Sequence, residues 1–182
     1  MTTAPQSATE RDQLLALLDQ STQVYLNTIS SVPAAAVNVK PTPECWSILE
    51  VAEHIAVAEH GMYRAIELAA EKTTPTDYDV DQKIILGGAN REFKFQAPEK
   101  SHPKGRWKTL AECVEAFKTS RARSIEFLKS AEALRNKQVQ HPALGPVDAY
   151  QCALIMAKHV ERHSAQIEEI KHSEAYREAA GE

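Results

Sequence analysis

The sequence predicts an all-α protein, a four-helix bundle with one long crossover between the second and third helices. Two observations predict this class. Apolar residues recur at helical spacing in four segments, and three of these segments begin with a capping-box motif. Alternation of apolar and polar residues never extends beyond a few positions, so strands add little to the expected core. The 182 residues suit one domain, residues 1–182, with its core between about 8 and 173.

The first two expected helices begin at serine capping boxes. The first begins at Ser7, with Glu10 three residues later, and ends before Pro33. Its apolar stripe consists of Leu14, Leu18, Tyr25 and Ile29. The second begins at Ser47, with Glu50 three residues later, and reaches about residue 70. Its stripe consists of Ile48, Val51, Ile55, Met62 and Ile66.

The third helix is expected to begin at the capping box Thr109–Glu112, and the fourth near Gly145–Pro146, continuing to about residue 176. Arg121 falls in the centre of the third helix's apolar stripe. Its guanidinium either pairs with Glu53 or another carboxylate at the core edge, or reaches solvent past a helix end. The segments 71–108 and 136–146 are expected to be irregular, apart from a short helical turn at 80–86.

Charge and cysteine content indicate which partners and which cellular location to expect. The net charge of −4 argues against nucleic acid as the main partner, because phosphate binding needs concentrated basic residues. Three scattered cysteines (Cys45, Cys113, Cys152) suit a reducing cytosol, and the chain shows neither a signal peptide nor a membrane span. We therefore expect a cytoplasmic protein that acts on a small molecule without a membrane partner. The sequence leaves a homodimer open.

Two histidines one helical turn apart are the most informative feature of the last helix. His163 falls near the centre of an apolar stripe and His159 within about 50° of it. The charged side is expected to carry Lys158, Glu161, Arg162, Glu168 and Glu169. Imidazoles at i and i+4 can share one metal ion, which gives a first interpretation. Two core histidines bonded to backbone or carboxylate oxygens are the second.

His54 is the third candidate ligand, because it lies at the edge of the second helix's apolar stripe beside small residues. The other histidines are expected in loops or on polar helix faces: His60, His102, His141 and His172. Three protein nitrogens would leave a coordination position open, as in catalytic metal sites. Glu50 either orients His54 or only caps its helix, and Gln166 either binds a ligand or a loop carbonyl.

Four motifs resemble the DinB-like, or damage-inducible, metal-binding family of four-helix proteins. They are Trp46-Ser47 followed by Glu50 and His54, the prolines and glycine of Ala97–Gly105, Phe117 with Arg121, and His159-x-x-x-His163-x-x-Gln166-Ile167. The resemblance runs from about residue 8 to 173. It implies an up-down-down-up bundle with one Zn²⁺ or Ni²⁺ held by three histidines, which map onto His54, His159 and His163.

The resemblance leaves the function open. Some relatives are similar to thiol S-transferases and isomerases that use mycothiol or bacillithiol, so a metal-dependent thiol transferase acting on a small molecule is one hypothesis. A metal-dependent hydrolase and a non-catalytic metal-binding stress or binding module are the alternatives. A di-iron site fits badly. Such sites use two Glu-x-x-His motifs that point into the bundle, whereas the motif present here, Glu169-x-x-His172, points outward. The zincin motif His-Glu-x-x-His is absent from the sequence.

Overall fold

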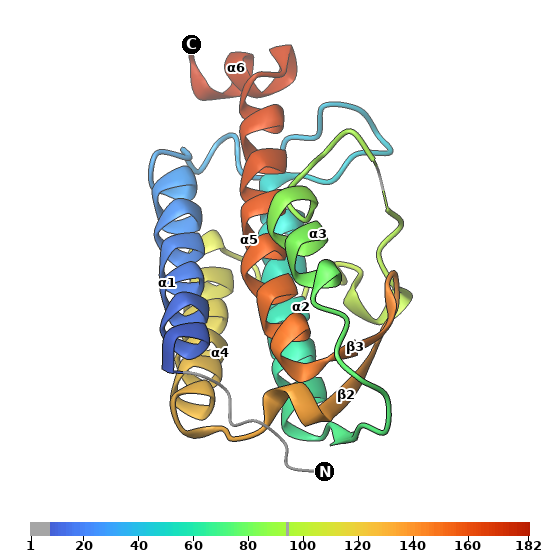
Figure 1. Ribbon diagram of the computed structural model, residues 1–182. Helices are drawn as coiled ribbons and strands as arrows, with labels where there is room; N and C mark the ends of the chain where they lie inside the picture. The colour runs from blue at the N-terminus through green and yellow to red at the C-terminus, as the bar shows by residue number, and fades with distance from the viewer. Residues whose placement is uncertain (1–7, 94) are drawn as a thin grey trace.

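Four long helices form the body of the protein (Figure 1), and the computed structural model describes residues 8–93 and 95–182. These helices are α1 (Ala8–Ser30), α2 (Ile48–Glu67), α4 (Leu110–Ser130) and α5 (Ala149–Lys171). Shorter elements join or follow them: α3 (Asp79–Gly87), α6 (Glu174–Ala180) and the single 3-10 turns η1 (Glu99–Ser101) and η2 (Leu134–Asn136). The helical class predicted from the sequence is confirmed. None of the helices in the described residues has the length and apolarity needed to cross a bilayer.

Side-chain caps set most of the helix starts. The boxes predicted at Ser47 and Thr109 are present, while Ser7 lies outside the described residues. The start predicted at Gly145–Pro146 is wrong. Asp148 caps α5 instead, accepting from the backbone N–H of Gln151 at 2.7 Å, because an aspartate satisfies the free amides of a first turn. The last helix also ends earlier than predicted, at Lys171, and α6 follows it.

A small antiparallel sheet closes one end of the bundle and corrects the prediction that 136–146 is irregular. It consists of β1 (Ala70–Glu71), β2 (Lys137–His141) and β3 (Gly145–Asp148), in the order β1-β2-β3. Val139 pairs with Val147, and both side chains are buried. Two buried valines are too short a pattern to reveal strands, and Gly145, at a φ of +73°, begins β3 directly after the turn at 142–144.

The sheet marks the end of the bundle at which α1 and α5 begin and α2 and α4 end. β1 directly follows α2, and β3 leads directly into α5. The guanidinium of Arg11, in the first turn of α1, donates to the carbonyl of Ala131 just beyond α4 at 2.7 Å. The first half of α2 therefore lies beside the second half of α5, far from the sheet (Figure 1).

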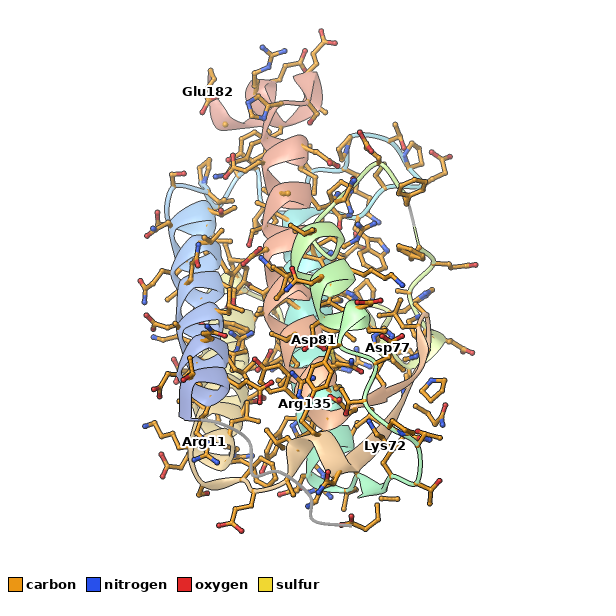
Figure 2. The ribbon with its side chains drawn as sticks, in the orientation of Figure 1. Arg11, Lys72, Asp77, Asp81, Arg135 and Glu182 are labelled. Carbon is orange, nitrogen blue, oxygen red and sulfur yellow. The ribbon has the colours of Figure 1, made fainter. Side chains whose placement is uncertain are left out.

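A cluster of charged side chains fastens α3 to this sheet end. Arg135 binds Asp81 of α3 through two N–O contacts of 3.0 and 2.6 Å, and it also contacts Glu10 and Asp148. Figure 2 shows Arg135 and Asp81 close together near the first turns of α5. The Arg135 guanidinium also lies 3.8 Å from the centre of the Tyr150 ring, a cation–π contact. Arg135 therefore joins α1, α3 and α5 and fixes where the long crossover starts.

A second buried ion pair lies between two apolar clusters of the core. Arg121 of α4 binds Glu59 of α2 through contacts of 2.8 and 2.9 Å, and it donates to the Leu18 carbonyl of α1 at 2.7 Å. Both charged side chains are almost fully buried. Along α4, Arg121 lies between Phe117 of one cluster and Leu128 of the other. Of the two alternatives that the sequence left open for Arg121, the structure shows pairing, and the partner is Glu59 rather than Glu53.

We expect Arg121→Met to lower the free energy of unfolding by about 3–5 kcal/mol, because it leaves the Glu59 carboxylate buried without its counter-charge. Urea denaturation measures the change. Arg123→Met, which removes an exposed arginine of the same helix, is the matched control and should change stability little. Arg121→Met combined with Glu59→Leu should recover most of the loss. An unchanged denaturation midpoint for Arg121→Met alone would contradict this account.

Candidate metal centre

The structure brings His54, His159 and His163 together where α2 meets α5. One ring nitrogen from each lies within 4.8 Å of the others. The Nε2 atoms of His54 and His159 are 3.1 Å apart, and the centres of the His159 and His163 rings are 4.4 Å apart. The predicted spacing along α5 places two rings on one face, and packing of α2 against α5 supplies the third.

Hydrogen bonds fix the tautomers of two of the three rings. The Nδ1 of His54 lies 2.8 Å from the carbonyl oxygen of Ser101, in η1. A carbonyl only accepts hydrogen bonds, so His54 carries its proton on Nδ1 and presents a lone pair on Nε2. The indole of Trp46 packs against the same ring with a centre-to-centre distance of 5.0 Å.

Gln166 has the equivalent role for His163. Its Oε1 lies 2.8 Å from His163 Nδ1 and 3.4 Å from Nη1 of Arg91. Because arginine can only donate, this amide atom must be the oxygen, and it therefore accepts the proton of His163 Nδ1 as well. His163 consequently also presents a lone pair on Nε2. The sequence left open whether Gln166 binds a ligand or a loop carbonyl. In the structure its side chain hydrogen-bonds to His163 instead.

His159 differs from the other two rings. Its Nδ1 is buried and has no hydrogen-bond partner among the described residues, while its Nε2 faces His54. As a whole, the residue is partly exposed, whereas His54 and His163 are buried. The region around His159 is thus where the cluster approaches the surface. Because His54 Nε2 presents a lone pair 3.1 Å from His159 Nε2, His159 Nε2 is the donor of this contact, and a metal ion bound there would require the His159 proton to move to Nδ1.

Burial keeps the three imidazoles neutral. It lowers the pKa of His163 to about 3, and the neighbouring His54 adds to this shift. Burial and the two other rings lower the pKa of His159 well below the usual value. Burial also lowers the pKa of His54, against the opposing effect of the Ser101 hydrogen bond. Neutral imidazole is the form that binds a metal ion.

Glu53, the residue before His54 in the sequence, holds the loop whose Ser101 carbonyl orients the His54 ring. The Glu53 carboxylate accepts from the backbone N–H groups of Lys104 and Gly105 at 2.7 and 2.9 Å, and it binds Arg106 at 2.7 Å. Burial alone would raise the Glu53 pKa, but these hydrogen bonds outweigh it and lower the pKa. Glu53 therefore stays charged and holds the loop that follows the Ser101 carbonyl.

Glu50 does not orient His54. Its carboxylate accepts from the backbone N–H of Ser47 at 2.8 Å and pairs with Lys40 at 2.8 Å. Of the two roles that the sequence left open, the structure shows helix capping, and the Ser101 carbonyl takes the role of orienting His54. No periodicity predicted Ser101, because it lies in the irregular crossover.

The crossover also supplies residues that the sequence did not reveal. Gly88, at the end of α3, lies so close to α5 that an added Cβ would come within 2.8 Å of the Lys158 Cβ. This close approach directs the following residues over α5, where Arg91 pairs with Glu169 through contacts of 3.0 and 2.7 Å. Arg162, predicted on the charged face, is only 9% exposed because this segment covers it.

Two surface cavities flank Trp107, and no histidine of the cluster lines either. One, of about 640 Å³, lies between α2 and α4; the other, of about 350 Å³, lies beside the start of α2.

The donor set fits a divalent metal ion. Two nitrogens bound tetrahedrally to one Zn²⁺ lie roughly 3.3 Å apart, close to the 3.1 Å between the Nε2 atoms of His54 and His159. Imidazole nitrogens suit zinc and nickel alike. No carboxylate or thiolate belongs to the cluster found among the described residues.

Comparison with known proteins identifies the family of this chain. The sequence profile of the DinB superfamily matches residues 17–167. The chain belongs to the DinB superfamily. A solved structure, described as YfiT from Bacillus subtilis, "a probable metal-dependent hydrolase with an unusual four-helix bundle topology", resembles this DinB chain with a TM-score of 0.66. The two are 12% identical over 94% of this chain and 91% of that one, so the likeness shows the fold alone. A comparison with curated proteins finds no match.

We expect the metal-free protein to lose stability as the pH falls from 6.5 to 5. The folded-state pKa values of the three rings lie below the unfolded value of about 6.5, so protons favour the unfolded chain in this range. Each ring adds up to about 1.4 kcal/mol per pH unit. Urea denaturation at several pH values measures the slope. His163→Gln should reduce it, and His60→Gln, at an exposed position of α2, should not.

Proposed function

We propose that the three histidines hold one divalent cation, Zn²⁺ or Ni²⁺, and that this centre acts on a small molecule as a metal-dependent hydrolase. The observation that carries the proposal is the pair of fixed tautomers. Ser101 and Gln166 place protons on Nδ1 of His54 and His163, so both Nε2 lone pairs are free for a cation. A bound cation there would act as a Lewis acid and lower the pKa of a bound water.

The neutral donor set favours an anionic fourth ligand. Three imidazoles leave both positive charges of the ion uncompensated, and hydroxide would offset one of them. A coordination position stays open, because the chain brings three donors and the His159 side approaches the surface. The likeness to YfiT, described as a probable metal-dependent hydrolase, supports the same reaction class.

A metal-dependent thiol transferase is the second candidate, and the same charge argument favours it, because a thiolate is also an anionic ligand. The chain's own thiols lie elsewhere. Cys45 is exposed before α2, and burial raises the pKa of Cys113 and Cys152 to about 12. A thiolate at the centre would therefore come from a bound small molecule such as mycothiol or bacillithiol.

We further propose the up-down-down-up order for the four long helices. It is supported by the common end at which α1 and α5 begin and α2 and α4 end. This order puts the first half of α2 beside the second half of α5, where His54 faces His159 and His163.

We expect untagged protein, purified without chelator, to carry up to one Zn²⁺ or Ni²⁺ per chain. His163→Ala should lose most of it, because two nitrogens rarely retain a labile ion. Elemental analysis measures the stoichiometry. His60→Ala is the matched control on an exposed surface and should keep the wild-type content. Equal metal content in wild type and His163→Ala would contradict the proposed centre.

The two reaction classes make different predictions for the Co²⁺-substituted protein. A hydrolase should cleave a simple ester such as 4-nitrophenyl acetate, and His163→Ala should lose this activity. A thiol transferase should instead show a sulfur-to-metal charge-transfer band with millimolar mycothiol or bacillithiol. Full Co²⁺ loading with neither result would refute both enzymes and leave a metal-binding module.

A further inference from the structure

Arg162 is a buried cation with little to neutralise it. The residue is 9% exposed, yet among the described residues its guanidinium makes one hydrogen bond, from Nη2 to the carbonyl of Phe93. The Phe95 ring lies 5.5 Å from its Cζ. No carboxylate of the described residues lies within ion-pair distance of Arg162. A guanidinium has five N–H donors, and no nitrogen of Arg162 is among the buried side-chain atoms of the described residues that lack a partner, so a donor left over is within reach of solvent or a ligand.

Arg162 lies on the same side of α5 as the histidine cluster. At about 100° per residue, His159, Arg162, His163 and Gln166 fall within an arc of about 100°. The segment after α3 covers this side, and its Arg91 reaches Gln166.

The charges beside the cluster do not cancel. Arg91 and Arg162 are positive, and Glu169 is a carboxylate close enough to act on the charge of Arg162. Arg91 already binds both oxygens of Glu169. Two cations and one anion leave a net positive charge next to the partly exposed His159. A guanidinium without a paired carboxylate, next to a cluster that approaches the surface at His159, offers N–H donors to an anionic ligand.

We propose that Arg162 binds a carboxylate of the small molecule that reaches the metal centre, so that the protein acts on organic acids. This inference rests on the proposed metal centre. The planar guanidinium matches a carboxylate through two parallel hydrogen bonds, which gives orientation as well as affinity. The acid would then be held at two points, by Arg162 and by the metal. Exposed Phe93 and Phe95 offer apolar surface for its carbon skeleton.

The test measures binding to the Co²⁺-loaded protein with a graded series of mercapto acids and their amides. The acids are 2-mercaptoacetate, 3-mercaptopropionate and 4-mercaptobutyrate. Each thiolate binds the metal, and only the acid offers a carboxylate to Arg162. The sulfur-to-metal band gives Kd for each compound. In the wild type we expect one chain length to bind at least about tenfold tighter as the acid than as the amide.

Variants separate this role from a structural one. Arg162→Met should bring the acid-to-amide ratio close to one while leaving Co²⁺ content and amide affinity unchanged. Arg162→Lys should give an intermediate ratio, because a lysine keeps the charge but loses the planar fork. Arg123→Met removes an exposed arginine of α4 and should keep the wild-type ratio.

The outcomes distinguish the two proposals. Co²⁺ uptake with equal affinity for acids and amides, or with binding of neither, overturns the role of Arg162 and leaves the metal centre standing. An unchanged preference for the acid in Arg162→Met does the same. Absence of Co²⁺ uptake by the wild type overturns the proposed centre itself, and with it the inference drawn from it.

Discussion

The requirement that shapes this protein is the burial of imidazole rings at one point between α2 and α5. An unpaired polar ring in a core is costly, so each buried nitrogen needs a partner or a ligand. His54 and His163 each use Nδ1 for an oxygen supplied by another residue, and this leaves both Nε2 atoms directed at the cluster. The rest of the fold can be understood as what keeps those oxygens in place.

The two oxygens are held in different ways. The Ser101 carbonyl belongs to η1, and the loop after η1 is fixed by the charged Glu53 carboxylate next to His54. Gln166 lies one turn beyond His163 on the same helix, and Arg91 of the crossover fixes its amide. Both supports depend on the long crossover. The Arg135 cluster at the sheet end anchors its first half by binding Asp81 of α3.

Helix phase predicted the three histidines, because their spacing and apolar neighbours are local properties of α2 and α5. The sheet was missed, since its buried valines make too short a pattern. Ser101, Arg91 and the burial of Arg162 were also missed. Their contacts depend on the path of residues 71–108, which no periodicity encodes. The glycine at 88 is compatible with a close approach, but only the structure shows that α5 is the neighbour.

Two arginines of the long helices, Arg121 and Arg162, differ in whether a carboxylate pairs with them, and this difference indicates which charge stabilises the fold and which is available to a ligand. Arg121 meets Glu59 through two contacts and gives its remaining donors to α1, so its charge is fully used within the core. Arg162 is 9% exposed against 2% for Arg121, and it meets only a backbone carbonyl and an aromatic ring among the described residues. A fold that pairs one arginine so completely has the means to pair the other. The unpaired charge of Arg162, beside imidazole nitrogens that can bind a metal ion, is therefore best explained by a role in binding the ligand.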